Sequence, residues 1–387
     1  MKELAIKCNV KNEVKDLLKE KILTRNTEVI DCVFEQNDEL KIIGLKVTYD
    51  DSVDENEIKE YVQNIVKDMD KAFVPTVKTL WENQPERKFY TNIYEQLEDL
   101  GYITEMGTGI VALGDILINL LKYFDNQIIK IAKKNYNPMF VQYPTLIKYD
   151  VLDRINYMNT LHTSLMFVSS VDECSEKDEF QQLDYDSYFT KTKGLKMCLP
   201  PSICYHTYFQ FCNTEITDNM VVSAKGKTFR HEGKAARKLE RLWDFSMREV
   251  IFLGDEKFVK DNAVGVFVDE IILLLERLGL NGKIVSADDM FFCENEAIGD
   301  KIAKKIENKK YEVRLNIDEE NTIAVGSFNL HYDFFGEHFN IRKDGKNIHT
   351  SCTGYGLERF VYAFLCQHGI DADKWPEEVK KEILDGK

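Results

Sequence analysis

The spacing of apolar positions sets the first 85 residues apart from the rest of the chain. Residues 13–23 and 54–73 carry apolar side chains three and four positions apart, which predicts two amphipathic helices. Residues 29–34 and 40–49 read as strands, and the short polar turn between them predicts a hairpin. We therefore expect a small α/β unit over residues 1–85, ending in a linker at 74–87. Its expected role is docking or stabilisation.

Longer elements are predicted in residues 86–387. The pattern indicates a helix over 111–134, stopped by Asn137-Pro138, and another over 261–280. Strand patterns cover 139–144, 195–207, 283–292, 311–317 and 322–334. Strands joined mainly by hairpins, with helices packed on one side, are typical of an α+β fold built on an antiparallel sheet.

Composition narrows the class of protein. The 387 residues are 44% hydrophobic and 30% charged, as in ordinary globular proteins. No signal-peptide pattern opens the chain, and no apolar stretch approaches the length of a membrane span. The nine cysteines have no disulfide-like spacing, which favours a reducing cytoplasm.

The charge balance bears on partners. Acidic residues outnumber basic ones, giving a formal net charge of −15 and a pI near 5.1. A protein that binds a long polyanion usually presents a basic face, because neutralising phosphates supplies much of the affinity. The negative net charge therefore argues against tRNA as a partner. It does not exclude a local contact with RNA, because basic residues concentrate at 225–241.

Two separated motifs suggest a site for ATP. In Thr228-Phe-Arg-His-Glu, Arg230 and Glu232 would share one face of a strand. A basic loop follows, and the returning segment carries Phe245 and Glu249, four positions apart. Near the C-terminus, Gly354-Tyr-Gly-Leu-Glu-Arg opens a helical pattern and delivers Arg359. The loop contains four cations, Lys234, Arg237, Lys238 and Arg241. Together these groups would suit a bent triphosphate and point to carboxylate activation by ATP.

These motifs resemble those of a known family. The Phe-Arg-x-Glu segment, basic loop and Phe-x-x-x-Glu return resemble motif 2 of class II aminoacyl-tRNA synthetases, and Gly-x-Gly-x-x-Arg resembles their motif 3. The chain is most similar to the zinc-dependent seryl-type branch, and within it to truncated homologues that ligate amino acids to carrier proteins. The resemblance, from about residue 100 to 387, implies a class II catalytic domain over residues 86–387. Helix 111–134 and strand 139–144 resemble motif 1, which implies a homodimer, although an ordinary core helix has the same periodicity.

The resemblance also implies a metal site. In that branch a Cys before motif 2, a Glu closing motif 2 and a Cys before motif 3 hold zinc, and Cys204, Glu249 and Cys352 stand in register here. Three protein ligands leave one position open, where the α-amine of an amino acid would bind one Zn²⁺ per chain. The competing interpretation is that both cysteines are ordinary buried thiols, as expected for Cys212, Cys293 and Cys366.

The roles implied for the nucleotide site follow the same motifs. Arg230 would clamp the α-phosphate and the substrate carboxylate, and is the predicted catalytic residue. Glu232 would accept a hydrogen bond from the adenine amine, and Phe245 and Arg359 would hold the adenine ring. Arg237 or Arg241 would meet the γ-phosphate, and the sequence does not choose between them.

The strand Ser327-Phe-Asn-Leu-His-Tyr-Asp resembles the Ser-x-Asn strand of the seryl branch. Asn329 and Asp333 are therefore the candidate substrate-binding residues. Mg²⁺ is expected with ATP, but the acid that the branch carries shortly before this strand is missing, since the chain reads Ile323-Ala-Val-Gly. Glu320 lies somewhat earlier in the sequence, so the sequence does not identify the residue that would bind magnesium.

The sequence thus predicts a cytoplasmic ligase that converts a small amino acid to its adenylate. We expect transfer to the phosphopantetheine thiol of an acyl or peptidyl carrier protein. The first 85 residues lack a long helical arm and only 28 residues follow Arg359 (387−359), so tRNA is not expected as a partner. The alternatives are an atypical seryl-type tRNA synthetase and a catalytically silent paralogue that keeps the fold for regulation.

Overall fold

The first 71 residues form a small N-terminal module in the computed structural model. The structure describes residues 1–387 apart from 11–14, 25, 27, 38–40, 72–77, 87, 172–186, 188, 288–309 and 385–387. In the N-terminal module, β1 (Lys2–Val10), β3 (Ile42–Tyr49) and β2 (Val29–Gln36) form an antiparallel sheet in that order. Helices α1 (Lys15–Thr24) and α2 (Glu55–Lys71) bury Leu18, Ile22, Ile58 and Val62 against it. The predicted pairing of strands around 29–34 and 40–49 is confirmed, and β1 is an unpredicted third strand.

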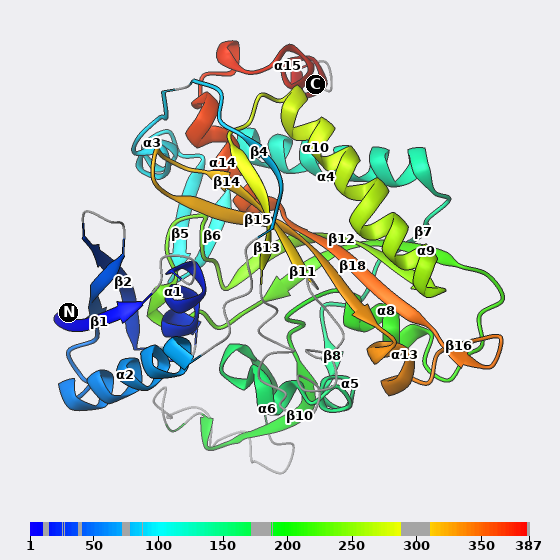
Figure 1. The fold of residues 1–387 in the computed structure, drawn as a ribbon, viewed down its shortest axis with the longest axis horizontal. Coiled ribbons are helices and arrows are strands. Elements are labelled where there is room, and N and C mark those ends of the chain that lie inside the picture. Colours follow the sequence, from blue (N-terminus) through cyan, green and yellow to red (C-terminus); the bar gives the residue numbers. More distant parts are fainter. Residues whose placement is uncertain are drawn as a thin grey trace.

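An eight-stranded sheet carries the rest of the fold (Figure 1). All neighbouring strands are antiparallel except β7, which runs parallel to β11. Across the sheet the order is β4 (Thr79–Asn83), β13 (Gly282–Ala287), β14 (Lys310–Asn316), β15 (Thr322–Tyr332), β18 (His349–Gly356), β12 (Asp244–Gly254), β11 (Met220–Phe229) and β7 (Met139–Val141). The predicted α+β class is confirmed. Residues 79–83 fall within the expected linker but form β4.

One face of this sheet is covered by long helices. Val250, Phe252 and Tyr355 point into a core shared with α4 (Asp115–Asn135), α10 (Phe267–Arg277) and α14 (Leu357–His368). Helix α4 begins later than predicted because residues 110–113 form β6, which pairs with β5 (Ile103–Gly107). The predicted helix 261–280 opens with a π-helical turn at Asp261–Val266 after the short α9 (Glu256–Lys260). Helices α3 (Ile93–Asp99) and α15 (Glu377–Leu384) contribute Leu97 and Val379 to the same core.

Shorter elements cover the opposite face. Ile251, Leu253 and Cys352 point into a second core with α5 (Tyr149–Asp153), α6 (Tyr157–Thr160), α8 (Cys204–Gln210) and α13 (Phe334–His338). A small sheet of β8 (Ile147–Lys148), β10 (Thr192–Cys198) and β9 (Phe167–Val171) closes this side, and β16 (Arg342–Lys343) pairs with β17 (Lys346–Asn347). Within the described ranges, no helix is long and apolar enough to cross a membrane.

Candidate functional site

Strand register brings the predicted metal ligands together. Glu249 in β12 stands opposite Gly354 in β18, and Cys352 stands opposite Asn329 in β15. Cys204 reaches the same core from the first residue of α8. We expected Cys204 on a strand, but β10 ends at Cys198, and Pro200-Pro201 cannot continue a ladder that needs their N–H groups.

Cys204, Glu249 and Cys352 form a compact, buried group, which we call the Cys–Glu–Cys group. One ligand atom from each residue lies within 4.8 Å of the others, and the residues are 4%, 1% and 5% exposed. Burial raises the pKa of the Cys204 thiol well above its usual value, and burial likewise raises the pKa of the Glu249 carboxyl. Three groups that become negative on ionisation are costly to bury together unless a cation compensates them.

The Glu249 carboxylate is oriented by its neighbours. Its Oε1 accepts hydrogen bonds from the Ser202 hydroxyl at 2.6 Å and from the Ile203 N–H at 3.3 Å. Its Oε2 is buried and has no hydrogen-bond partner in the described part of the chain. One oxygen is therefore free to bind a metal, and two thiolates with one carboxylate oxygen form a donor set that fits zinc.

Polar neighbours also surround Cys352. The Asn329 amide Nδ2 lies 3.7 Å from its Sγ, and the His331 Nε2 lies 3.8 Å away. Burial lowers the pKa of His331 to about 3, so its ring is neutral, and its Nδ1 lies 3.2 Å from the Tyr208 hydroxyl. Sequence reasoning missed Ser202 and His331. The signal for His331 was its period-two spacing from Asn329 on one strand.

The motif 2 arginine lies just beyond a strand end. Strand β11 stops at Phe229, so Arg230 is not on the strand as predicted, although its N–H still donates to the Trp243 carbonyl at 3.0 Å. Its Nε donates to the Pro201 carbonyl at 3.2 Å, close in sequence to Ser202. Its guanidinium lies 5.5 Å from the centre of the Phe245 ring. Arg230 therefore links the segment before Cys204 to the aromatic ring expected at the adenine.

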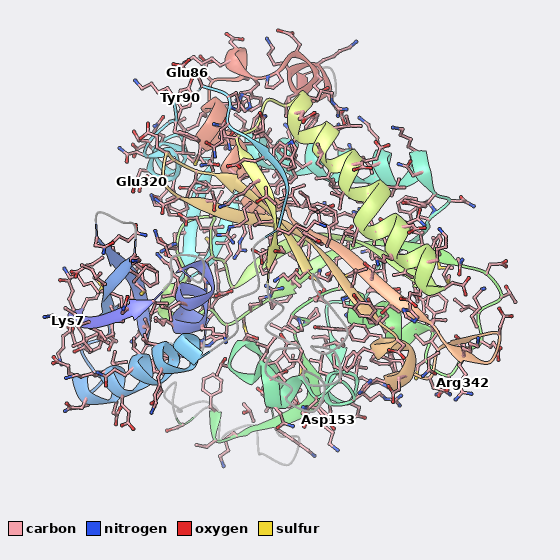
Figure 2. The ribbon with its side chains drawn as sticks, viewed as in Figure 1. Lys7, Glu86, Tyr90, Asp153, Glu320 and Arg342 are labelled. Atoms are coloured by element: carbon pink, nitrogen blue, oxygen red, sulfur yellow. The ribbon has the colours of Figure 1, made fainter. Side chains whose placement is uncertain are left out.

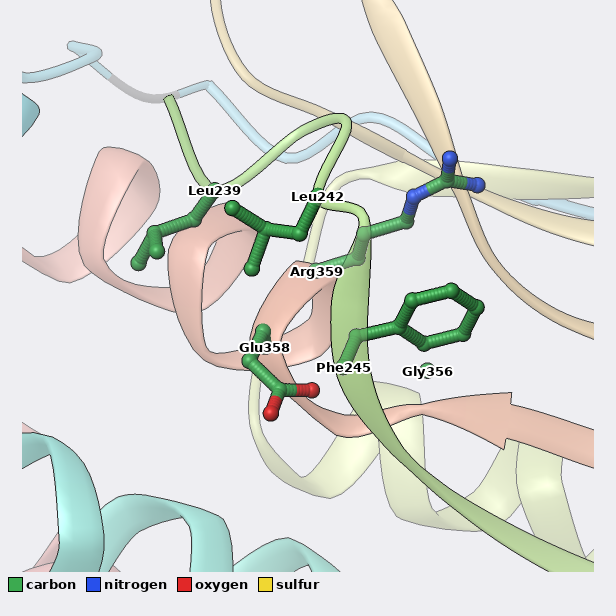
Figure 3. Close-up of a pocket in the computed structure, with 6 residues that line it drawn as sticks. All are labelled: Leu239, Leu242, Phe245, Gly356, Glu358 and Arg359. Atoms are coloured by element: carbon green, nitrogen blue, oxygen red, sulfur yellow. The ribbon is translucent and has the colours of Figure 1, made fainter. Parts of the chain in front are cut away.

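Phe245 and Arg359 line a common pocket (Figure 3). The Phe245 and Arg359 side chains extend in the same direction in this view. The Arg359 Nε donates a hydrogen bond to the Glu240 carbonyl at 2.6 Å. Glu358 accepts the Ser246 N–H with both carboxylate oxygens, at 2.9 and 2.8 Å, and so fixes the start of α14 against β12. The pocket is lined by Leu239, Leu242, Phe245, Gly356, Glu358 and Arg359.

The remaining predicted residues are arranged differently. Glu232 forms an ion pair with Arg241 at 2.5 Å, so these two candidate ATP contacts face each other. Asn329 adjoins the Cys–Glu–Cys group, but Asp333 is exposed beyond the end of β15, where its carbonyl accepts the Glu337 N–H. Glu320 lies at the outer end of the β14–β15 hairpin (Figure 2). Cys366 is buried in the core as predicted, whereas Cys293 lies outside the described residues.

Comparison with known proteins identifies relatives across most of the chain. No family model matches it. It is 28% identical over 355 residues to a type-2 serine–tRNA ligase from Methanococcus maripaludis, covering 85% of this chain and 67% of the relative. It is 30% identical over 313 residues to the same type of enzyme from Methanococcus aeolicus, covering 75% of this chain and 58% of the relative.

Solved structures show the same fold. A Methanopyrus kandleri seryl-tRNA synthetase, solved with A. aeolicus tRNASec, matches 99% of this chain and 77% of that chain, with a TM-score of 0.72 and 20% identity. Seryl-tRNA synthetase from Pyrococcus horikoshii, complexed with ATP, matches 85% of this chain and 79% of that one, with a TM-score of 0.60 and 13% identity.

These findings contradict the predicted carrier-protein ligase and the prediction that tRNA is not a partner. The relatives are named as tRNA ligases, and the structure that matches 99% of this chain, N-terminal module included, is bound to a tRNA. Our expectation relied on the missing helical arm and on where the chain ends. The missing helical arm does not exclude tRNA binding by a different kind of N-terminal module. The position of the chain end is no evidence about the acceptor. The chain is homologous to the type-2 serine–tRNA ligases and has the fold of a class II synthetase.

Proposed function

We propose that the protein activates serine with ATP and transfers the seryl group to tRNA. The observation that carries the proposal is the buried Cys–Glu–Cys group, whose Glu249 lies on the same strand, β12, as Phe245. Phe245 in turn contacts Arg230 and shares a pocket with Arg359. A metal beside an ATP site suits selection of a free amino acid, because its open position accepts an amine. Serine and tRNA are proposed from the named activity of the homologues.

The metal site would recognise the substrate amine. Cys204, Glu249 and Cys352 would hold one zinc ion, which would supply a Lewis acid for binding the amine. Asn329, whose amide points to the Cys352 sulfur, would support the thiolate and border the amino-acid pocket. Asp333 and Glu320 have no part in this proposal, because both are exposed.

Arg230 would act at the reacting phosphorus. Its planar guanidinium can bind the substrate carboxylate and the α-phosphate together, which orients the attacking oxygen and neutralises charge as pyrophosphate leaves. Phe245 would stack on adenine, and Arg359, which lines the same pocket, would contact the ring as well. Mg²⁺ would accompany ATP as the counter-ion of its phosphates.

Amino-acid-dependent exchange of pyrophosphate into ATP tests the activation step. We expect exchange with serine in a panel of amino acids, and a loss of roughly 100-fold or more in kcat/KM for Arg230→Ala. Arg342→Ala, which changes an exposed arginine in β16, serves as the control with normal exchange.

A charging assay with total tRNA tests the acceptor separately. Radiolabelled serine should become acid-precipitable on tRNA in an ATP-dependent reaction. Serine exchange without charged tRNA would contradict the acceptor alone. The absence of exchange with every amino acid would contradict the activation step and favour a silent paralogue.

A further inference from the structure

The N-terminal module contacts the basic loop through ion pairs. We define the basic loop as residues 233–241. Lys234 Nζ lies 2.7 Å from a carboxylate oxygen of Glu28 and 2.7 Å from one of Asp50. Arg237 Nη1 lies 3.3 Å from the Asp31 Oδ1. Three acidic side chains of the N-terminal module therefore face two cations of the loop, across about 200 residues of sequence.

An apolar contact anchors the same interface. Ala235 is 2% exposed and belongs to the buried cluster that forms the core of the N-terminal module. It lies in the 3₁₀ turn Gly233–Ala235, which packs against β2. The loop is thus docked by burial as well as by charge, so removing one carboxylate should leave it in place.

The other cations of the basic loop also face carboxylates. Lys238 lies 3.1 Å from Glu95, and Arg241 pairs with Glu232. Arg237 has a second acidic neighbour, since its Nε lies 3.2 Å from a Glu240 oxygen. Each of the four loop cations therefore pairs with at least one carboxylate. A triphosphate that needs one of them must displace a carboxylate.

We infer that the N-terminal module is an acidic brake on the ATP site, in which Asp31, with Glu28 and Asp50, competes with the phosphates of ATP for the basic loop. The inference rests on the proposed function, because it takes the loop cations as the partners of the terminal phosphates. Competition for shared cations is reciprocal: module pairing weakens ATP binding, and bound ATP weakens module pairing to the same extent. Access of ATP thereby depends on a part of the chain that contributes no residue to the pocket.

Substitution of Asp31 tests the competition directly. Asp31 pairs with Lys19 of its own module at 3.1 Å as well as with Arg237. In Asp31→Asn the KM for ATP in pyrophosphate exchange should fall about two- to fivefold at low salt, with kcat unchanged, because the carboxylate no longer competes with the phosphates for Arg237. The difference should shrink at high salt, where such pairs are screened. The matched control is Asp51→Asn, which removes the same charge from the turn after β3. Asp51 pairs with the N-terminal amine and not with the basic loop.

Hydrogen exchange gives a second readout that needs no turnover. Saturating ATP should speed exchange at residues 233–237 and in β2 of the wild type, because the ion pairs between them break. An unchanged or higher KM in Asp31→Asn would overturn the inference, as would an equal fall in Asp51→Asn. Exchange protection that is unaffected by ATP would overturn it too.

These outcomes separate the inference from the proposed function. Normal serine exchange with an unchanged KM in Asp31→Asn would overturn the brake alone. A wild type that neither binds ATP in calorimetric titration nor exchanges pyrophosphate would overturn the proposed function and the brake together.

Discussion

At the scale of single residues, the metal site depends on how one carboxylate is turned. Ser202 and the Ile203 N–H donate to Glu249 Oε1, which leaves the buried Oε2, without a hydrogen-bond partner among the described residues, available to a metal. The Ser202 oxygen also lies 3.4 Å from the Cys204 sulfur. Groups that hold metal ligands in this way commonly affect metal affinity by one to two orders of magnitude.

Removing the Ser202 hydroxyl should therefore weaken metal binding. In Ser202→Ala we expect zinc affinity to fall about 10- to 100-fold, since Glu249 can then turn away from the sulfurs. Competition with a chromogenic chelator measures the affinity. Cobalt substitution should give an altered sulfur-to-metal charge-transfer band in the variant.

Two variants control this experiment. Ser202→Thr keeps the hydroxyl and should restore affinity. Ser223→Ala removes a buried hydroxyl that accepts from Arg248 and should leave metal binding unchanged. Equal affinity in Ser202→Ala and wild type would show that Glu249 needs no support from Ser202.

At the scale of elements, sequence periodicity located the long helices and part of the main sheet, but it missed the main-sheet strands β4 and β18. Motif order predicted that Cys204, Glu249 and Cys352 would converge, and strand register achieves this for the last two. The exact ends were less predictable: Arg230 lies past the end of β11, and Cys204 begins a helix. Such ends depend on backbone pairing with distant strands, which local patterns do not specify. The ion pairs that Lys234 and Arg237 form with the N-terminal module were not predictable either, because those acids lie in a different module.

A buried ion pair joins the helix layer to the sheet. Arg248 in β12 donates to both carboxylate oxygens of Asp125 in α4, at 2.6 and 3.2 Å. Lys225 in β11 lies 3.1 Å from the same carboxylate. Both members of the Arg248–Asp125 pair are buried, so Arg248 without Asp125 would be an uncompensated buried charge.

Asp125→Ala should lower the free energy of unfolding by about 3–5 kcal/mol, because Arg248 would stay buried without a counter-ion. Urea denaturation followed by circular dichroism measures the change. Lys134→Ala breaks an exposed pair with Glu270, and should cost less than about 1 kcal/mol. A similar small loss in both variants would contradict the structural role of the buried pair.

At the scale of the whole molecule, charge is distributed unevenly. The net charge of −15 includes an acidic N-terminal module, and the cations of the basic loop are already paired. The net charge of the chain was therefore a poor basis for arguing against a polyanion such as the tRNA named for the homologues. A cationic side chain that pairs with a carboxylate can pair with a phosphate instead. Met139 and Phe140 in the edge strand β7 are exposed. The predicted homodimer, expected from the likeness of this segment to motif 1, stays a prediction.

The central claim is that a metal bound by two cysteines and a glutamate lies beside an ATP site. Elemental analysis of the purified full chain, beside its Cys352→Ser variant, tests it most directly. We predict about one zinc per wild-type chain, since three protein ligands define a single site, and little or none in the variant. Wild-type protein without a transition metal, or equal zinc in both proteins, would contradict the account.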